Sequence, residues 1–233
     1  MNDDALQNSH IIPEFLYRPG YDEKGRLLEL SGDVGRKKLI QKGYRERLLC
    51  AGCETHIGRF EKYFADLWYQ TDPLPNPVTT NGILRSFDYQ PFKLFLLSIL
   101  WRAGISEREE FSTVRLGPYE NELREMLLHE DPGPDTQFQI YGLVLLAPQT
   151  ASPCHGTIMP PARLRLPAGQ TGYEFIFAGV SWNFISSKQT TDAIRLGALS
   201  ESGTMSFPVR SLEDDRNFTQ FMKDYFATRR RNR

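Results

Sequence analysis

Two short segments near the N-terminus contain the residue types that could perform chemistry. The segment SHIIP offers the imidazole of His10, and the segment LLCAGCE offers the thiols of Cys50 and Cys53 and the carboxylate of Glu54. An imidazole with a pKa of about 6.5 can deprotonate water at neutral pH if a second group orients it. Two thiolates in a Cys-x-x-Cys spacing can share one zinc ion, which usually takes four ligands.

Taken together, the two segments resemble the HNH, or ββα-metal, endonuclease family. In that family a strand ends in a sequence of the Asp-His-Ile-Ile-Pro type. A Leu-Leu-Cys-x-x-Cys element follows, and a His or Asn after its second Cys opens a helix. SHIIP and LLCAGCE occupy these two places here, and an amphipathic pattern begins at Thr55. The resemblance covers roughly residues 5 to 70, which is under a third of the chain.

The resemblance implies a one-metal nuclease site. His10 would be the general base, and one Mg²⁺ or Mn²⁺ ion would stabilise the scissile phosphate. The family's metal ligands are the Asp before the His and the residue after the second Cys, and these positions hold Ser9 and Glu54 here. The Glu54 carboxylate is a hard oxygen ligand that suits either ion, whereas the neutral hydroxyl of Ser9 contributes little charge.

The sequence departs from the family pattern at three places. Ser9 replaces the Asp, and Tyr44, Arg45 and Glu46 stand where the family has an Asn a few residues before Leu-Leu-Cys. Only nine residues stand before His10 and none is a Cys, so the family's earlier Cys-x-x-Cys pair has no equivalent here. A Zn²⁺ ion at Cys50 and Cys53 therefore lacks two ligands. Replacement ligands are available in the sequence as His56, or as Cys154 and His155.

Each of these candidates also has a purely structural interpretation. His10 can be a histidine satisfied at the end of a strand, and Cys50 and Cys53 can be thiols packed under the start of a helix. The Glu54 carboxylate is favourable at the positive end of a helix dipole without binding any metal. Both interpretations remain open from the sequence.

A basic segment runs directly into LLCAGCE. Residues 36 to 47, RKKLIQKGYRER, carry six basic side chains and one acidic side chain. We expect this segment either to contact nucleic-acid phosphates beside the site or to be a solvated loop. Residues 107 to 135 hold nine acidic against three basic residues, so that face is expected to avoid polyanions. The six basic residues are Arg36, Lys37, Lys38, Lys42, Arg45 and Arg47.

Composition limits the classes of partner. The chain has 28 basic and 29 acidic residues and a net charge of −1, so nucleic-acid binding requires a local patch. The longest apolar run, residues 92 to 101, is about half the roughly 20 residues that a bilayer span needs. No signal peptide is visible, and three cysteines are too few for a disulfide framework. A cytoplasmic protein without a membrane partner is expected.

The hydrophobic periodicity predicts an α+β fold. We expect a small N-terminal HNH-like ββα module over residues 1 to 72, a Pro-rich linker over 71 to 82, and an α+β domain over 83 to 233. The later domain should have a mostly antiparallel sheet, packed on a central helix, and a terminal helix. The helices are predicted at residues 55–70, 87–103, 118–129 and 215–228. The strands are predicted at residues 26–30, 139–147, 173–185, 193–198 and 205–209, with Gly179 marking a bulge.

Two functions follow from these expectations. The first is a metal-dependent HNH-type endonuclease that cleaves nucleic acid, DNA in preference to RNA, in the bacterial or phage defence setting that the family implies. The alternative is a catalytically inactive HNH-like relic that serves as a nucleic-acid-binding or protein-binding module. In that case the C-terminal domain would bind a protein or a small ligand.

Overall fold

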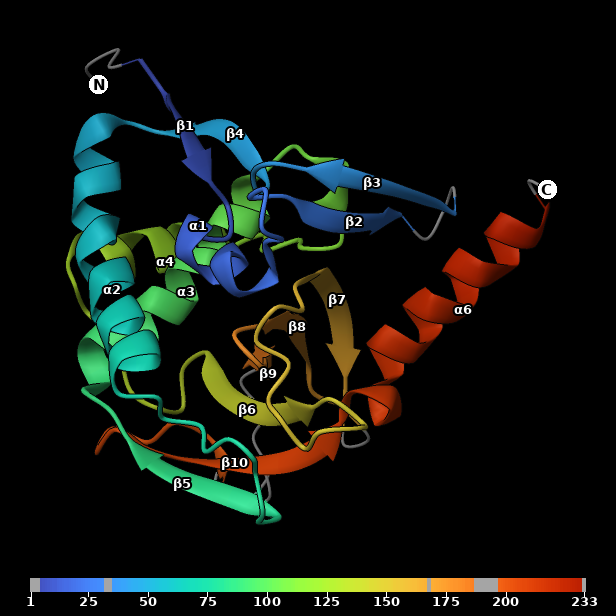
Figure 1. Ribbon diagram of the computed structural model, residues 1–233. Helices are drawn as coiled ribbons and strands as arrows, with labels where there is room; N and C mark the ends of the chain where they lie inside the picture. Colours follow the sequence, from blue (N-terminus) through green and yellow to red (C-terminus); the bar gives the residue numbers. More distant parts are fainter. Residues whose placement is uncertain (1–4, 32–34, 167–168, 187–196, 232–233) are drawn as a thin grey trace.

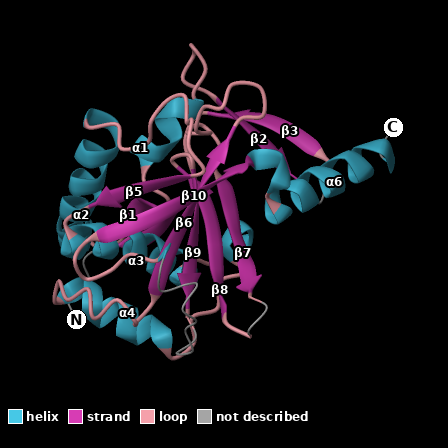
Figure 2. Ribbon diagram, turned by 90° about the horizontal axis from the view of Figure 1, so that it is seen from below, coloured by secondary structure: helices cyan, strands magenta, loops and turns pink. Residues whose placement is uncertain are grey.

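The computed structural model describes residues 5–31, 35–166, 169–186 and 197–231 (Figures 1 and 2). The fold is mixed α+β, as predicted, with a six-stranded sheet and helices packed against it. None of the described helices is long and apolar enough to cross a lipid bilayer.

The six-stranded sheet has the strand order β5-β10-β6-β9-β8-β7. Every neighbouring pair is antiparallel except β10 and β6, which run parallel, so the predicted mostly antiparallel sheet is confirmed. The strands are β5 (Gly82–Ser86), β6 (Gln139–Leu146), β7 (Met159–Arg165), β8 (Thr171–Phe177), β9 (Val180–Ile185) and β10 (Thr204–Ser211).

One face of this sheet is covered by helices whose apolar periodicity the sequence shows. They are α2 (Ala51–Gln70), α3 (Tyr89–Ile105) and α4 (Tyr119–Leu128). Trp68 of α2 packs at 5.5 Å between ring centroids against Trp182 of β9, and its indole N–H donates to the carbonyl of Ala178. The same buried cluster reaches Phe92 of α3 and Phe207 of β10, so the core runs through both predicted domains. The division into two domains stays a prediction.

Residues 71 to 81, which were expected to be a linker, form no helix or strand before β5 begins at Gly82. The segment is nevertheless packed, because Leu74 and Val78 are buried in the core. Its backbone is therefore held against the body of the protein.

The N-terminal part contains two small antiparallel pairs. Strand β1 (Gln7–His10) pairs with β4 (Arg45–Leu49), and the chain between them forms the short helix α1 (Glu14–Tyr17) and the hairpin β2 (Leu27–Ser31) and β3 (Arg36–Ile40). The β2–β3 hairpin and the last helix, α6 (Arg216–Arg231), project from the body on the same side (Figures 1 and 2).

Three predictions about local structure were wrong or fall outside the description. Residues 173 to 185 form two strands, because Ala178 and Gly179 both have positive φ, 55° and 80°, as a two-residue hairpin turn requires. The basic segment is not a loop, since it forms β3 and part of β4. Of the predicted strand 193–198, only Gly197 and Ala198 are described, and neither lies in a strand.

Candidate functional site

The pairing of β1 with β4 brings the two chemistry-bearing segments together. Ser9 lies opposite Glu46 and His10 lies opposite Arg45, although 35 residues separate His10 from Arg45 in the chain. Helix α2 starts two residues after Leu49 and packs against both strands. The basic segment therefore provides a side chain to the candidate site itself.

His10 sits between a cation and a carboxylate. Its Nε2 atom lies 2.6 Å from Nε of Arg45 and 2.6 Å from Oε2 of Glu14. Because the guanidinium keeps its protons, Arg45 donates this hydrogen bond and the imidazole nitrogen accepts it. One nitrogen cannot also donate to Glu14, so the neutral ring leaves Oε2 of Glu14 buried without a donor.

Burial and the charge of Arg45 hold the pKa of His10 below its usual value, and the carboxylate of Glu14 opposes them in part. The ring is therefore neutral at pH 7 with its proton on Nδ1. The other oxygen of Glu14 accepts a hydrogen bond from the hydroxyl of Tyr21. A general base needs an unprotonated nitrogen that is free to accept, and Nε2 of His10 meets this requirement only when Arg45 releases it.

A buried arginine fixes the backbone of His10. Arg102 of α3 is 2% exposed, and its Nη1 atom donates to the carbonyl of His10 at 2.9 Å and to Oε1 of Glu61 at 2.7 Å. These two hydrogen bonds connect the end of β1 to α3 through Arg102 and to α2 through Glu61.

The hydroxyl of Ser9 is hydrogen-bonded within the antiparallel pair of β1 and β4. It accepts the N–H of Leu49 at 3.1 Å, donates to the carbonyl of Gln7 at 3.3 Å, and is 2% exposed. Ser9 thus supports the β1–β4 pairing and offers no free oxygen to a metal ion.

Glu54 lies near the end of the β1–β4 pair where Gln7 faces Leu49, whereas His10 lies at the opposite end. The N–H of Glu54 donates to the carbonyl of Cys50 in the first turn of α2, close to Gln7, which pairs with Leu49. Three strand residues separate Gln7 from His10, a span of about 10 Å. Seven helical residues, which also span about 10 Å, separate Glu54 from Glu61. Glu61 marks the position of His10 along α2, because Arg102 contacts both residues. No hydrogen bond or ion pair among the described residues joins His10 to Glu54, and a cleft shared by the two side chains stays a prediction.

Cys50 caps α2, and its sulfur accepts the N–H of Cys53 at 3.3 Å. Burial and the hydrogen bond with Cys50 raise the pKa of the Cys53 thiol. His56, a possible zinc ligand, instead uses its ring nitrogens toward the Leu127 carbonyl and Arg59. Over the described ranges, no three His, Cys, Asp or Glu side chains are grouped to hold a metal ion. The binding of Zn²⁺ at Cys50 and Cys53, and of Mg²⁺ or Mn²⁺ at Glu54, stays a prediction.

The basic residues divide into separate groups. Arg36, Lys37 and Lys38 are exposed on β3, and strand alternation puts Lys37 on the face opposite the other two. Arg45 is committed to His10. Lys42 lies in the turn before β4, Arg47 lies on β4, and both are exposed. None of the exposed five forms an ion pair with another described residue.

Sequence reasoning missed Glu14, Tyr21 and Arg102. The four-residue spacing of His10 and Glu14 was the only available signal, since that spacing suits a turn that brings two side chains together. Comparison of the chain with protein-family models, curated proteins and solved structures finds no match.

Proposed function

We propose that the protein binds nucleic acid through its phosphate backbone and that the β2–β3 hairpin is the main contact. The observation that supports this most strongly is the row of exposed cations on β3, Arg36, Lys37 and Lys38, none of which forms an ion pair with another described residue. The chain as a whole is not basic, so a concentrated local charge is what phosphate contact requires. Contacts of this kind are independent of base sequence.

The arrangement of β1, β4 and α2 adds support from the family resemblance. An antiparallel pair followed at once by a helix is the order of elements that the HNH-like pattern implies. We place the nucleic-acid-binding member of the two functions first, because the exposed cations of β3 support phosphate contact whether or not the chain binds a metal. A protein partner for the C-terminal sheet and a role in defence stay predictions.

Lysine footprinting tests the proposed contact directly. Lysines are acetylated with and without a saturating oligonucleotide at low salt, and modified peptides are quantified by mass spectrometry. We expect the oligonucleotide to protect Lys38 and Lys42, and to protect Lys37 less because strand alternation turns its side chain to the other face of β3. Lys62 on α2 is the internal control, because its side chain is 75% exposed and it should react equally in both samples. If Lys37, Lys38 and Lys42 react equally with and without the oligonucleotide, the proposal is contradicted.

Phosphodiester hydrolysis of the HNH type is a second candidate function, favoured by the neutral state of His10. Its Nε2 atom would accept the proton of the attacking water once Arg45 has moved from the imidazole to a phosphate of the substrate, and the nearby Glu14 carboxylate would stabilise the imidazolium that forms. If the protein cleaves nucleic acid in the presence of Mg²⁺ or Mn²⁺, we expect His10→Ala to slow cleavage by about 100-fold or more. Because the pKa of His10 is lowered, the parent's activity should fall only below about pH 6.5. Unchanged cleavage by the His10→Ala variant excludes His10 as the base.

A further inference from the structure

The two thiols at the start of α2 lie in contact with one another. Cys50 is the N-cap of the helix and Cys53 is the third helical residue, so their Cα atoms are one turn, or about 5 Å, apart. The Cys50 sulfur accepts the backbone N–H of Cys53 at 3.3 Å, and the two thiol groups are hydrogen-bonded to each other. The N-cap position therefore turns one sulfur toward the other.

This backbone geometry suits a bond between the two sulfurs. Disulfides usually join Cα atoms that are about 4.4 to 6.8 Å apart, and a separation of one helical turn falls within that range. Only the two side chains need to turn for the sulfurs to approach to about 2.05 Å. The bond would close a loop of Cys50, Ala51, Gly52 and Cys53 alone, so it adds little constraint to the fold. Such a bond suits a pair that is oxidised and reduced repeatedly.

The first turn of α2 leaves the thiol pair open to solvent. Cys50 and Cys53 are half-buried, whereas Ala51 and Gly52 between them are exposed and have the smallest side chains. Apart from the adjacent helix backbone, the only described atom within 4 Å of a Cβ atom placed on Gly52 is the Cys50 sulfur, at 3.9 Å. The space beside this sulfur therefore has room for a second molecule.

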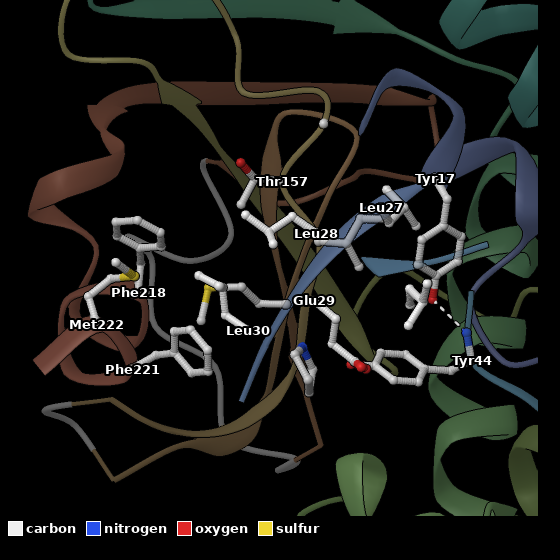
Figure 3. Close-up of a pocket in the computed structure, with 15 residues that line it drawn as sticks. Tyr17, Leu27, Leu28, Glu29, Leu30, Tyr44, Thr157, Phe218, Phe221 and Met222 are labelled. Carbon is white, nitrogen blue, oxygen red and sulfur yellow. Dashed lines mark hydrogen bonds between the residues drawn. The ribbon is translucent and has the colours of Figure 1, made fainter. Parts of the chain in front are cut away.

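The third cysteine lies in a different environment. Cys154 packs in a small apolar cluster with Leu145 and Phe218, beside the apolar groove between the β2–β3 hairpin and α6. Figure 3 shows Phe218 among the lining side chains of this groove, whose volume is about 250 Å³. Burial raises the pKa of the Cys154 thiol, which keeps it protonated and slow to react. Cys154 is therefore an internal control for the reactivity of Cys50 and Cys53.

We infer that Cys50 and Cys53 form a redox-active dithiol whose substrate is a low-molecular-weight disulfide of the glutathione type. This reaction is independent of nucleic-acid binding. Cys50 supplies the attacking sulfur, because two hydrogen bonds and the positive end of the α2 dipole stabilise a thiolate there. Cys53 supplies the second sulfur, which resolves the intermediate.

The exchange takes place in two steps. The Cys50 thiolate attacks one sulfur of the disulfide RSSR, so that the S–S bond breaks, a Cys50–SR mixed disulfide forms, and RS⁻ leaves and takes up a proton. Cys53 then loses its proton, and its sulfur attacks the Cys50 sulfur and displaces the second RS⁻, which is also protonated. The dithiol loses two electrons and two protons to become the Cys50–Cys53 disulfide, and RSSR is reduced to two RSH.

The test uses the full chain with Cys154→Ser, in which Cys50 and Cys53 are the only cysteines. The protein is first treated with a chelator, because Zn²⁺ would occupy the same thiolates. It is then exposed to excess oxidised glutathione, quenched with acid, alkylated and weighed by mass spectrometry. We expect a product that is lighter than the reduced protein by two hydrogen atoms, resists alkylation, and regains both thiols with dithiothreitol. Peptide mapping of the parent gives the same readout if Cys154→Ser does not fold.

Single substitutions separate the two roles. Cys53→Ser should stop the reaction at the mixed disulfide, with one glutathione retained on Cys50. Cys50→Ser should react more slowly by about 10-fold or more, because the attacking sulfur is gone. Serine is itself a favourable N-cap, so this variant keeps α2 capped. The matched control carries serine at both positions and retains only Cys154, and it should react as slowly as Cys50→Ser.

Three results would overturn the inference. The first is a Cys154→Ser protein that keeps both thiols, or that carries two stable glutathione adducts in place of an internal bond. The second is oxidation to a disulfide-linked dimer, which would show that the paired sulfurs belong to different copies of the chain. The third is Zn²⁺ that survives the chelator and protects both thiols, which would assign Cys50 and Cys53 to a metal site.

Discussion

Replacing Glu174 with glutamine is expected to stabilise the protein by about 3 kcal/mol above pH 7 and by much less at pH 5. Glu174 of β8 is 7% exposed and lies on the sheet face opposite the aromatic core. Burial raises its pKa to about 7, and the nearby carboxyl of Asp215 adds to the increase. A hydrogen bond from Ser181 and the charge of Arg210 act in the opposite direction.

The direction of the pH dependence follows from the difference in proton binding between the folded and the unfolded chain. The folded chain keeps the Glu174 proton up to about pH 7, whereas an unfolded Glu loses it near pH 4.5. Stability from this group is therefore complete below about pH 4.5 and is lost as the pH rises through 7. Glutamine mimics the protonated acid, because its carbonyl can take the place of Oε1, which accepts from Ser181, while its amide takes the place of Oε2 and donates to Asp215. The side-chain amide of Asn217, which donates to Oε2 in the parent, must then turn its own oxygen toward the new amide. The substitution should thus remove the pH dependence of this site.

Urea unfolding at pH 5 and pH 8 measures the effect. The control is Glu213→Gln, since Glu213 is an exposed carboxylate beside the base of α6 and the same change there should alter stability little. A Glu174→Gln variant that is less stable than the parent at pH 8 contradicts this account of the Glu174–Asp215 pair.

Elements with a clear hydrophobic period were predictable. The spacing of Ile57, Phe60 and Phe64 predicted α2, and the apolar run before Ala103 predicted the buried helix α3. The strands that sequence reasoning missed have weak local signals. Strand β3 is almost entirely charged at its start, and β7 contains two prolines, which its place at the sheet edge tolerates.

The turn between β8 and β9 was misread for a similar reason. Ala178 and Gly179 lack the Asn-Gly or Asp-Gly pair that usually marks a two-residue hairpin. The apolar run on either side therefore looked like one long strand with a bulge.

The candidate site was predictable in its residues but not in its contacts. His10 was found from its motif, yet its partner Arg45 depends on the register of two strands distant in sequence, which no local pattern encodes. The hydrogen bond that the Ser9 hydroxyl accepts from Leu49 likewise depends on how β1 and β4 pair.

The triple substitution Arg36→Ala, Lys37→Ala and Lys38→Ala is expected to weaken nucleic-acid binding strongly. Each phosphate contact releases counterions and contributes about 0.9 to the slope of log affinity against log salt for duplex DNA, and about 0.7 for a single strand. Removal of the three cations should lower that slope by roughly two units, since strand alternation turns Lys37 away from the other two. The loss should be similar for unrelated base sequences.

The salt dependence of this variant is the most direct test of the claim that the hairpin holds the nucleic-acid backbone. It is measured beside a control that removes the same charge from α2 and α4, by alanine at the exposed residues Arg59, Lys62 and Arg124. Both proteins must show the parent's circular dichroism spectrum. Our account predicts a slope lowered by about two units for the hairpin variant and a nearly unchanged slope for the control. A hairpin variant that binds as tightly as the parent at low salt, with the parent's slope, would contradict it.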